Sequence, residues 1–160
     1  MGKVIRKFTN GPAGTVSRAN DNVIVSMKND TELQIAFGAP VFLASGENAC
    51  KPFDASTCTA DNFLGFASRS PVKTPETYGS NTGAWNGDDP VEVLVRGSIV
   101  LYFDNTVTPG SKVYVRKSDG KLVTSAGAEG TTILLPNVIV RCARDTARCA
   151  EVVVSKRNIF

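Results

Sequence analysis

The chain has 160 residues, 42% of them hydrophobic, and 18 basic against 15 acidic side chains give it a formal net charge of +3. This length suits one domain with a proper apolar core. So small a net charge gives no reason to expect a nucleic-acid partner, and no apolar run approaches the roughly 18 residues of a membrane span. No early apolar run resembles a signal peptide, so we expect synthesis in a cytoplasm.

The first residues have the composition of an extended arm. Glycine and proline interrupt polar sequence over residues 1–21 without a sustained period, which is typical of a segment that gains structure by lying on a surface. We therefore divide the chain into an arm, 1–21, and a β domain, 22–160. The arm residues expected to contact a partner are Lys3, Val4, Ile5, Arg6, Lys7 and Phe8.

Charge is distributed unevenly along the chain. Residues 1–18 carry four basic side chains and no acidic one, whereas residues 45–92 carry seven acidic and three basic ones. This asymmetry favours contact with a charged neighbour, such as another copy of the chain. A solvated tail, or one tucked onto its own domain, is the alternative.

Strand patterns begin at Val23. Apolar side chains alternate over Val23–Met27 and again over Leu33–Phe37, and Asn29-Asp30 between them predicts a β-hairpin. A short strand follows at Val41–Leu43, and the continuous apolar run Phe63–Ala67 predicts a buried strand.

The stretch Pro71–Asp88 is the least regular part of the interior, and it contains Tyr78 and Trp85. Eighteen residues without a period inside a compact domain indicate a functional or flexible loop. Aromatic side chains in an exposed loop would suit an interface at Tyr78 and Trp85. Trp85 capping one end of the barrel is the other interpretation.

The longest strand pattern is Val91–Phe103, in which every odd position is apolar or glycine. Thirteen residues exceed an ordinary strand, and Gly97 is the natural place for it to bend and serve two sides of a barrel. We expect the core to be built around this strand.

Turn signals divide the last third into hairpins. Thr108-Pro109-Gly110 has the chemistry of a type II turn, and Asp119-Gly120 predicts a tight turn between Val113–Val115 and Leu122-Val123. Val138–Cys142 and Cys149–Val154 predict a final hairpin. Nine or ten strands and no helix indicate an all-β fold, a single β-barrel or jelly-roll-like sandwich with an extended N-terminal arm.

The four cysteines form two local pairs, Cys50 with Cys58 in a predicted loop and Cys142 with Cys149 across the last hairpin. Neither pair has the spacing of a zinc site, so no metal is expected. Either pair could form a disulfide, but a cytoplasmic origin favours free thiols. Both redox states stay open at this stage.

Catalytic motifs are missing from the sequence. The chain has no histidine, which removes Ser-His-Asp and Cys-His nucleophile systems, and it has no phosphate-binding glycine loop. Asp88-Asp89 follows Asn86-Gly87 and suits a turn better than an acid/base pair. We therefore predict no enzymatic activity and no cofactor.

Five segments, in this order, resemble the capsid cement proteins of tailed bacteriophages. They are AGTVSRANDNVIVSMKN, FGAPVFLASG, FLGFASRSPVKTPETY, DPVEVLVRGSIVLYF and VTPGSKVYVRKSDGKL. The similarity extends from Ala13 to Val123, and it rests on the ordered set of segments rather than on a catalytic motif.

The resemblance implies a structural virion protein on the outer capsid surface, where it would bridge major capsid protein subunits and stabilise the head, often as a trimer. Its partners would be the major capsid protein and other copies of itself. A module on the virion that binds a host-surface glycan through Tyr78 and Trp85 is the alternative function.

Overall fold

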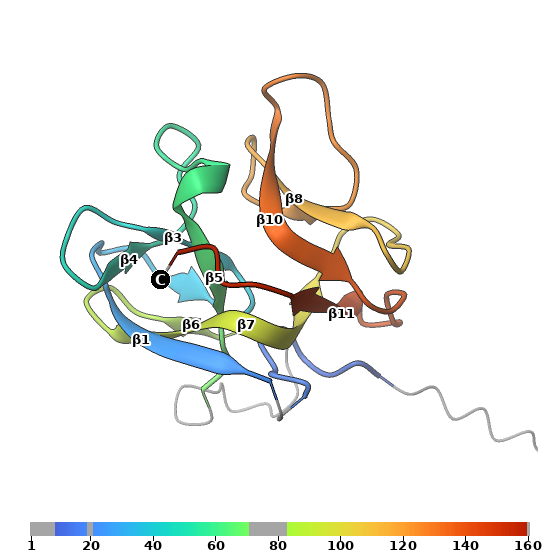
Figure 1. Ribbon diagram of the computed structural model, residues 1–160, viewed down its shortest axis with the longest axis horizontal. Coiled ribbons are helices and arrows are strands. Elements are labelled where there is room, and N and C mark those ends of the chain that lie inside the picture. The colour runs from blue at the N-terminus through green and yellow to red at the C-terminus, as the bar shows by residue number, and fades with distance from the viewer. Residues whose placement is uncertain (1–8, 19–20, 71–82, 160) are drawn as a thin grey trace, which may run out of the picture.

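The computed structural model describes residues 9–18, 21–70 and 83–159 (Figure 1). These residues form eleven strands and one short 3₁₀ turn, η1. The predicted all-β fold is confirmed. The elements are β1 (Val23–Asn29), β2 (Ile35–Ala36), β3 (Pro40–Leu43), β4 (Ala49–Lys51), η1 (Ala60–Asn62), β5 (Phe63–Ala67), β6 (Ala84–Trp85), β7 (Pro90–Tyr102), β8 (Lys112–Arg116), β9 (Leu122–Val123), β10 (Thr132–Val140) and β11 (Cys149–Val154).

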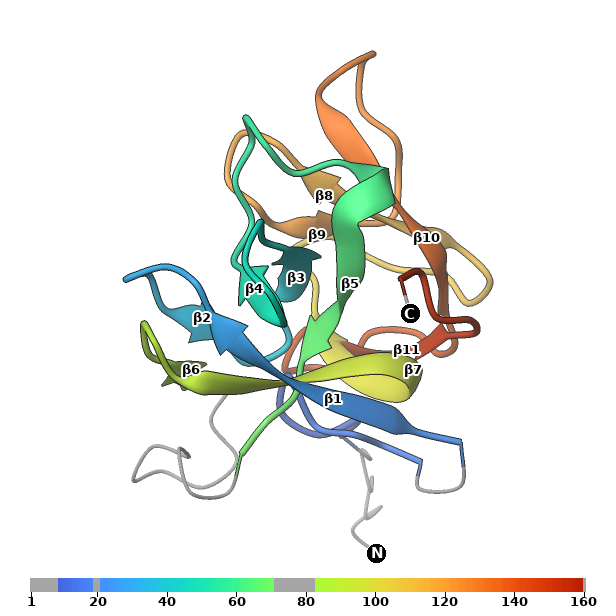
Figure 2. The ribbon, with the colours of Figure 1, turned by 60° about the vertical axis from the view of Figure 1, so that its left-hand side comes forward.

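Five strands close into a barrel in the order β1-β4-β3-β5-β7, and antiparallel pairing of β1 with β7 completes the ring. Closure matters because it leaves these strands without an unpaired edge. The same β7 continues into a second sheet, β7-β11-β10-β8-β9. In Figure 1, β1, β3, β4 and β5 lie to the left and β8, β10 and β11 to the right, and in Figure 2, β8 and β10 lie above β1 and β7.

The bend predicted in the long strand lies at Gly97. The first half of β7 pairs with β1 and β5, and the second half pairs with β11. Gly97 has a φ of 122°, a conformation that L side chains rarely adopt. The register between β1 and β7 also shifts by one residue between Val23 and Ile24. Such a bulge sharpens the local twist and redirects the strand.

The change of direction at Gly97 also exchanges the two faces of β7. Before it, Leu94 belongs to the larger core cluster; after it, Ile99 belongs to the same cluster. Side chains at even and odd positions of a regular strand point to opposite faces. Leu94 and Ile99 would therefore lie on opposite faces of a regular β7, and the face that contacts this cluster changes at Gly97. The odd positions before the glycine (Val91, Val93 and Val95) lie instead in the smaller cluster.

The larger core cluster fills the space between the barrel and the second sheet. Its centre is aromatic: Phe63 lies edge-on to Phe42 at 5.7 Å between ring centroids and edge-on to Phe66 at 5.4 Å. Such edge-to-face geometry is favourable for aromatic pairs. The smaller cluster lies inside the barrel end next to β2 and β6 and includes Ile35 and Phe37.

The predicted hairpin between the first two apolar runs is wrong. β1 pairs with β4 and β7, and β2 pairs with β6 instead. The buried Asn29 explains the difference, because its Nδ2 donates to the backbone oxygens of Leu33 (2.7 Å) and Asn86 (3.1 Å). Its Oδ1 accepts from the amide of Thr31 at 3.2 Å. The asparagine therefore organises a wide loop rather than a two-residue turn.

The later hairpins are confirmed. β8 pairs with β9, and β10 pairs with β11. The amide of Ser111 donates to the Thr108 carbonyl at 3.1 Å, and Gly110 has a φ of 87°, as a type II turn requires. β10 begins at Thr132, earlier than expected, and its register with β8 shifts between Leu134 and Ile139. In the part of the chain that the structure describes, no helix is long and apolar enough to cross a membrane.

Candidate interaction surfaces

Asn10, near the start of the described residues, is hydrogen-bonded to the body of the protein. The amide of Asn10 donates to Asp145 Oδ2 at 2.7 Å, and its Nδ2 donates to the carbonyl oxygens of Cys149 (2.8 Å) and Ala143 (3.2 Å). These partners belong to the loop between β10 and β11 and to the start of β11. We call this cluster the arm root, because residues 1–8 precede it directly in the sequence.

Residues 13–18 belong to the body of the protein. The amide of Gly14 donates to the Val100 carbonyl oxygen at 2.8 Å, and the amide of Val100 donates to the Thr15 carbonyl oxygen at 2.9 Å. The segment therefore lies along β7. Ala13 is buried, and a Cβ on Gly14 would meet the Phe37 Cβ at 2.9 Å. A domain that begins at residue 22 leaves out these contacts, and the division into an arm, 1–21, and a domain, 22–160, stays a prediction.

A partly buried ion pair holds the far end of this segment. Arg18 Nε donates to Glu151 Oε1 at 2.8 Å, and the Ser17 hydroxyl donates to the same oxygen at 2.8 Å. Burial by itself would raise the pKa of Glu151, but the hydrogen bonds from Arg18 and Ser17 and the charge of Arg18 outweigh it and lower that pKa. Glu151 therefore stabilises the folded state when it is ionised.

This arrangement predicts an acid-dependent loss of stability. Since the folded-state pKa of Glu151 lies below its usual value, its contribution is present above about pH 4.5 and is lost as the pH falls through the folded-state pKa. We expect Glu151→Gln to lower the free energy of unfolding by about 1–3 kcal/mol at pH 7. The difference from the unmodified protein should shrink below pH 4.5, as measured by urea denaturation across pH.

The matched control for this prediction is Asp21→Asn. Asp21 pairs with Arg96 at 2.9 Å, but its side chain is 71% exposed, against 12% for Glu151. Exposed pairs contribute less than about 1 kcal/mol. Equal losses in the two variants would contradict the role assigned to Glu151.

The predicted contact residues of the arm, Lys3, Val4, Ile5, Arg6, Lys7 and Phe8, lie outside the described residues, as does Tyr78. Their placement at an interface stays a prediction. The arm root was missed by sequence reasoning, because its partners are more than 130 positions away from Asn10. The isolated asparagine carries no signal of such a contact.

Trp85 does not lie on the surface. It belongs to β6, is 5% exposed, and donates from Nε1 to the Ser68 carbonyl at 3.0 Å. Its ring also lies edge-on to Phe37, with centroids 6.1 Å apart. A surface platform at Trp85, for a partner or for a sugar, is therefore wrong: pairing of β6 with β2 carries the ring into the smaller core cluster.

The two possible disulfides are not formed, since Cys50, Cys58, Cys142 and Cys149 are all free thiols. Cys142 Sγ accepts from the Glu151 amide at 3.2 Å and lies 3.5 Å from Asn10 Oδ1, whereas Cys149 Sγ lies 3.7 Å from the Ala147 carbonyl oxygen. Cys50 and Cys58 belong to different core clusters. Burial raises the pKa of the Cys50 thiol to about 11, so it is neutral at ordinary pH.

No group of three or more histidine, cysteine, aspartate or glutamate side chains within residues 9–18, 21–70 and 83–159 is arranged to hold a metal ion. What these residues present instead is a closed barrel and an N-terminal segment that hydrogen-bonds at both ends to the β10–β11 loop and β11 of the second sheet.

Sequence comparison identifies the family. The phage family described as "Structural cement protein (E217 gp24/Pam3 gp6)" matches residues 3–155. The chain belongs to this family of cement proteins. Membership gives it a structural role in a phage virion and agrees with the resemblance found in its segments. No curated protein matches the chain at a significant level.

A solved structure shows the same fold. A chain in the structure titled "The capsid of Myoviridae Phage XM1" superposes with a TM-score of 0.72 and 19% sequence identity, over 96% of this cement protein and 96% of that chain. At this identity the likeness concerns the fold, and it covers the barrel and the second sheet together.

Proposed function

We propose that this cement protein binds the outer surface of its capsid and bridges neighbouring major capsid protein subunits as a trimer, without catalytic activity. The observation that carries the proposal is the arm root. Asn10 fastens the chain to the β10–β11 loop through three hydrogen bonds, so the preceding residues start from a fixed point on a rigid body. An arm with a fixed origin is suited to reach a neighbouring subunit.

Repeated weak contacts over the shell would supply the affinity of this protein. An arm contact of a few residues is weak by itself, but a body and an arm that engage neighbouring subunits act together and gain affinity through effective concentration. The barrel helps because its closed strands leave few edges for unwanted pairing among many copies.

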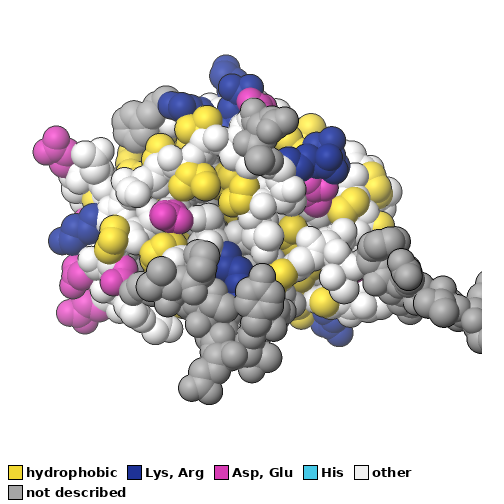
Figure 3. Space-filling model, turned by 90° about the horizontal axis from the view of Figure 1, so that it is seen from below, with side chains coloured by type: hydrophobic (Ala, Val, Ile, Leu, Met, Phe, Trp, Pro, Cys, Tyr) yellow, Lys and Arg dark blue, Asp and Glu magenta, His cyan; other side chains and the backbone are white. Residues whose placement is uncertain are grey.

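Charge supports association between copies. Acidic side chains gather at one end of the face in Figure 3. The exposed residues Asp30, Glu32 and Asp88 lie in neighbouring loops of the barrel, where Asp88 contacts Lys28 at 3.7 Å and Gly87 lies against Glu32. An arm with three cations would complement such a surface on another copy, and head-to-tail contacts of this kind close into rings such as trimers.

The test is removal of the arm with the arm root left intact. A variant lacking residues 2–8 should keep the thermal midpoint of the full chain, and its occupancy on purified heads that lack this protein should fall about tenfold or more, as quantified by cryo-imaging. Deletion must stop before Asn10, because loss of that residue would also remove the hydrogen bonds of the root.

Charge-matched variants distinguish a specific contact of the arm cations from a general effect of positive charge on binding. Lys3→Gln/Lys7→Gln should weaken binding, whereas Lys112→Gln/Lys156→Gln, which removes two exposed cations elsewhere, should not. Full occupancy by the shortened chain would overturn the arm's role. Native mass measurement of the full chain, free and after release from heads, tests the trimer.

A further inference from the structure

A cluster of basic side chains converges on Asp104, which follows β7. Lys121 Nζ lies 2.7 Å from a carboxylate oxygen of Asp104, Arg148 lies 3.9 Å from one, and Arg116 4.0 Å. Arg144 donates to the Asp104 carbonyl oxygen at 2.7 Å. Asp119, which pairs with Arg116, is the second acid in this group. The cations outnumber the carboxylates, and the side chains of Lys121 and Arg148 are 54% and 55% exposed.

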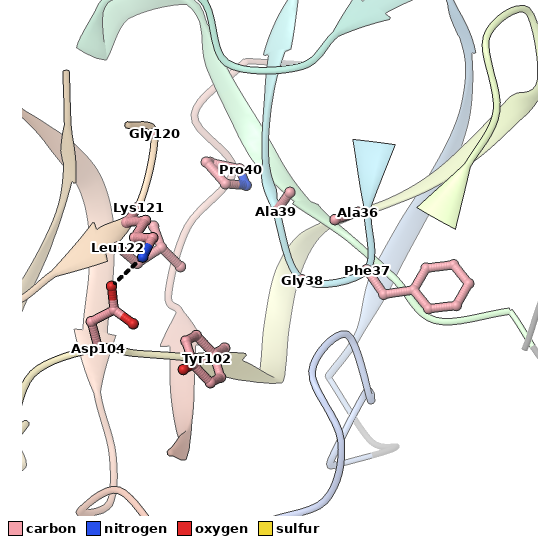
Figure 4. Close-up of a pocket in the computed structure, with 10 residues that line it drawn as sticks. All are labelled: Ala36, Phe37, Gly38, Ala39, Pro40, Tyr102, Asp104, Gly120, Lys121 and Leu122. Atoms are coloured by element: carbon pink, nitrogen blue, oxygen red, sulfur yellow. Dashed lines mark ion pairs between the residues drawn. The ribbon is translucent and has the colours of Figure 1, made fainter. Parts of the chain in front are cut away.

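An apolar slot of about 160 Å³ opens on one side of Asp104. Residues 36–40, from β2 to the start of β3, line it on one side, and the second sheet contributes Tyr102 and Leu122 (Figure 4). The Phe37 ring points away from the slot, whereas the Lys121–Asp104 ion pair stands at its edge. Ala36 and Tyr102 are exposed, so the slot is open to a partner's side chain.

A larger groove of about 640 Å³ is also lined by Asp104. Among the other residues that line the groove are Arg116, Lys117, Ser118 and Val123. The cation cluster therefore lies beside an apolar slot and a larger groove, which share Asp104.

We propose that this surface, the Asp104 cluster with its slot and groove, binds an extended protein segment that carries an apolar side chain next to carboxylates. Excess cations select acidic groups, and the slot selects an apolar anchor, which is the combination typical of binding hot spots. A nucleic acid would meet the cations but would leave the slot unused. On the virion the segment would belong to the shell, and in this respect the inference rests on the proposed function.

Two variants test the two halves of the site on heads that lack this protein. Lys121→Gln/Arg148→Gln should weaken binding of the full chain about tenfold at 50 mM salt and should make its affinity less dependent on salt. Ala36→Trp should fill the slot and weaken binding at both 50 and 300 mM salt. Lys112→Gln/Lys156→Gln and Ala55→Trp, at exposed positions outside the site, should bind like the unmodified chain.

A second probe does not depend on heads. A labelled octapeptide of alternating glutamate and phenylalanine should shift the amide NMR signals of Tyr102, Asp104 and Lys121, and Lys121→Gln/Arg148→Gln should abolish these shifts. Unchanged head binding by both site variants would overturn the inference, as would signals that respond to a DNA duplex and not to the peptide. If the unmodified chain ignores heads, the proposed function fails, and the peptide experiment alone then decides the inference.

Discussion

Gly97→Ala is expected to destabilise the protein by about 3 kcal/mol or more. Two effects add: the φ of 122° strains any L residue, and a Cβ would collide with Asn22, whose Oδ1 overlaps the added atom and whose Cα lies 2.9 Å away. Asn22 cannot move aside freely, because its Oδ1 accepts from the Ser98 amide at 3.2 Å. Urea denaturation gives the free energy of unfolding.

Gly110→Ala is the matched control. Gly110 also has a positive φ, 87°, but a Cβ there would meet nothing within 4 Å. Its cost should be confined to backbone strain, about 1 kcal/mol. Similar losses in both variants would mean that the close approach of Asn22 to Gly97 is unimportant for stability.

The long strand shows what periodicity can predict. The apolar odd positions from Val91 to Phe103 predicted its extent to within one residue, and the glycine predicted its bend. Both signals are local, since alternation follows from the pleat and the bend follows from the missing Cβ. The hairpins closed by Asp119-Gly120 and by the β10–β11 loop were predictable for the same reason.

Pairing between distant strands was not predictable. Alternation identifies β1 as a strand but does not name its partners, and a buried asparagine, Asn29, looks like an ordinary turn residue in the sequence. Only the structure shows that this side chain joins the loop after β1 to Asn86.

The candidate surfaces depend even more on long-range contacts. The Asp104 cluster gathers residues from the end of β7, the β8–β9 hairpin and the β10–β11 loop. In the sequence, each of these cations is indistinguishable from an ordinary solvated surface charge. The arm stays a prediction from composition, and the Asn10 contacts of its root carried no signal in the sequence because they join residues more than 130 positions apart.

Trp85→Ala is expected to destabilise the fold by about 3–5 kcal/mol, the usual cost of truncating a buried aromatic side chain. The indole is 5% exposed, packs against Phe37 and joins β6 to the Ser68 carbonyl. Since domains are stable by only about 5–15 kcal/mol, this is a large share of the total. Thermal and urea unfolding of the purified variant measure it, and attachment to heads should fall only in proportion to the unfolded fraction.

Trp85→Phe separates packing from hydrogen bonding. It keeps a ring beside Phe37 but removes the donor to Ser68, so the loss should be about 1–3 kcal/mol, the cost of a buried carbonyl without its partner. A sugar-binding platform would behave in the opposite way, because truncation would abolish binding to glycans and leave stability unchanged. That result would restore the glycan-binding function and would contradict the placement of Trp85 in the core.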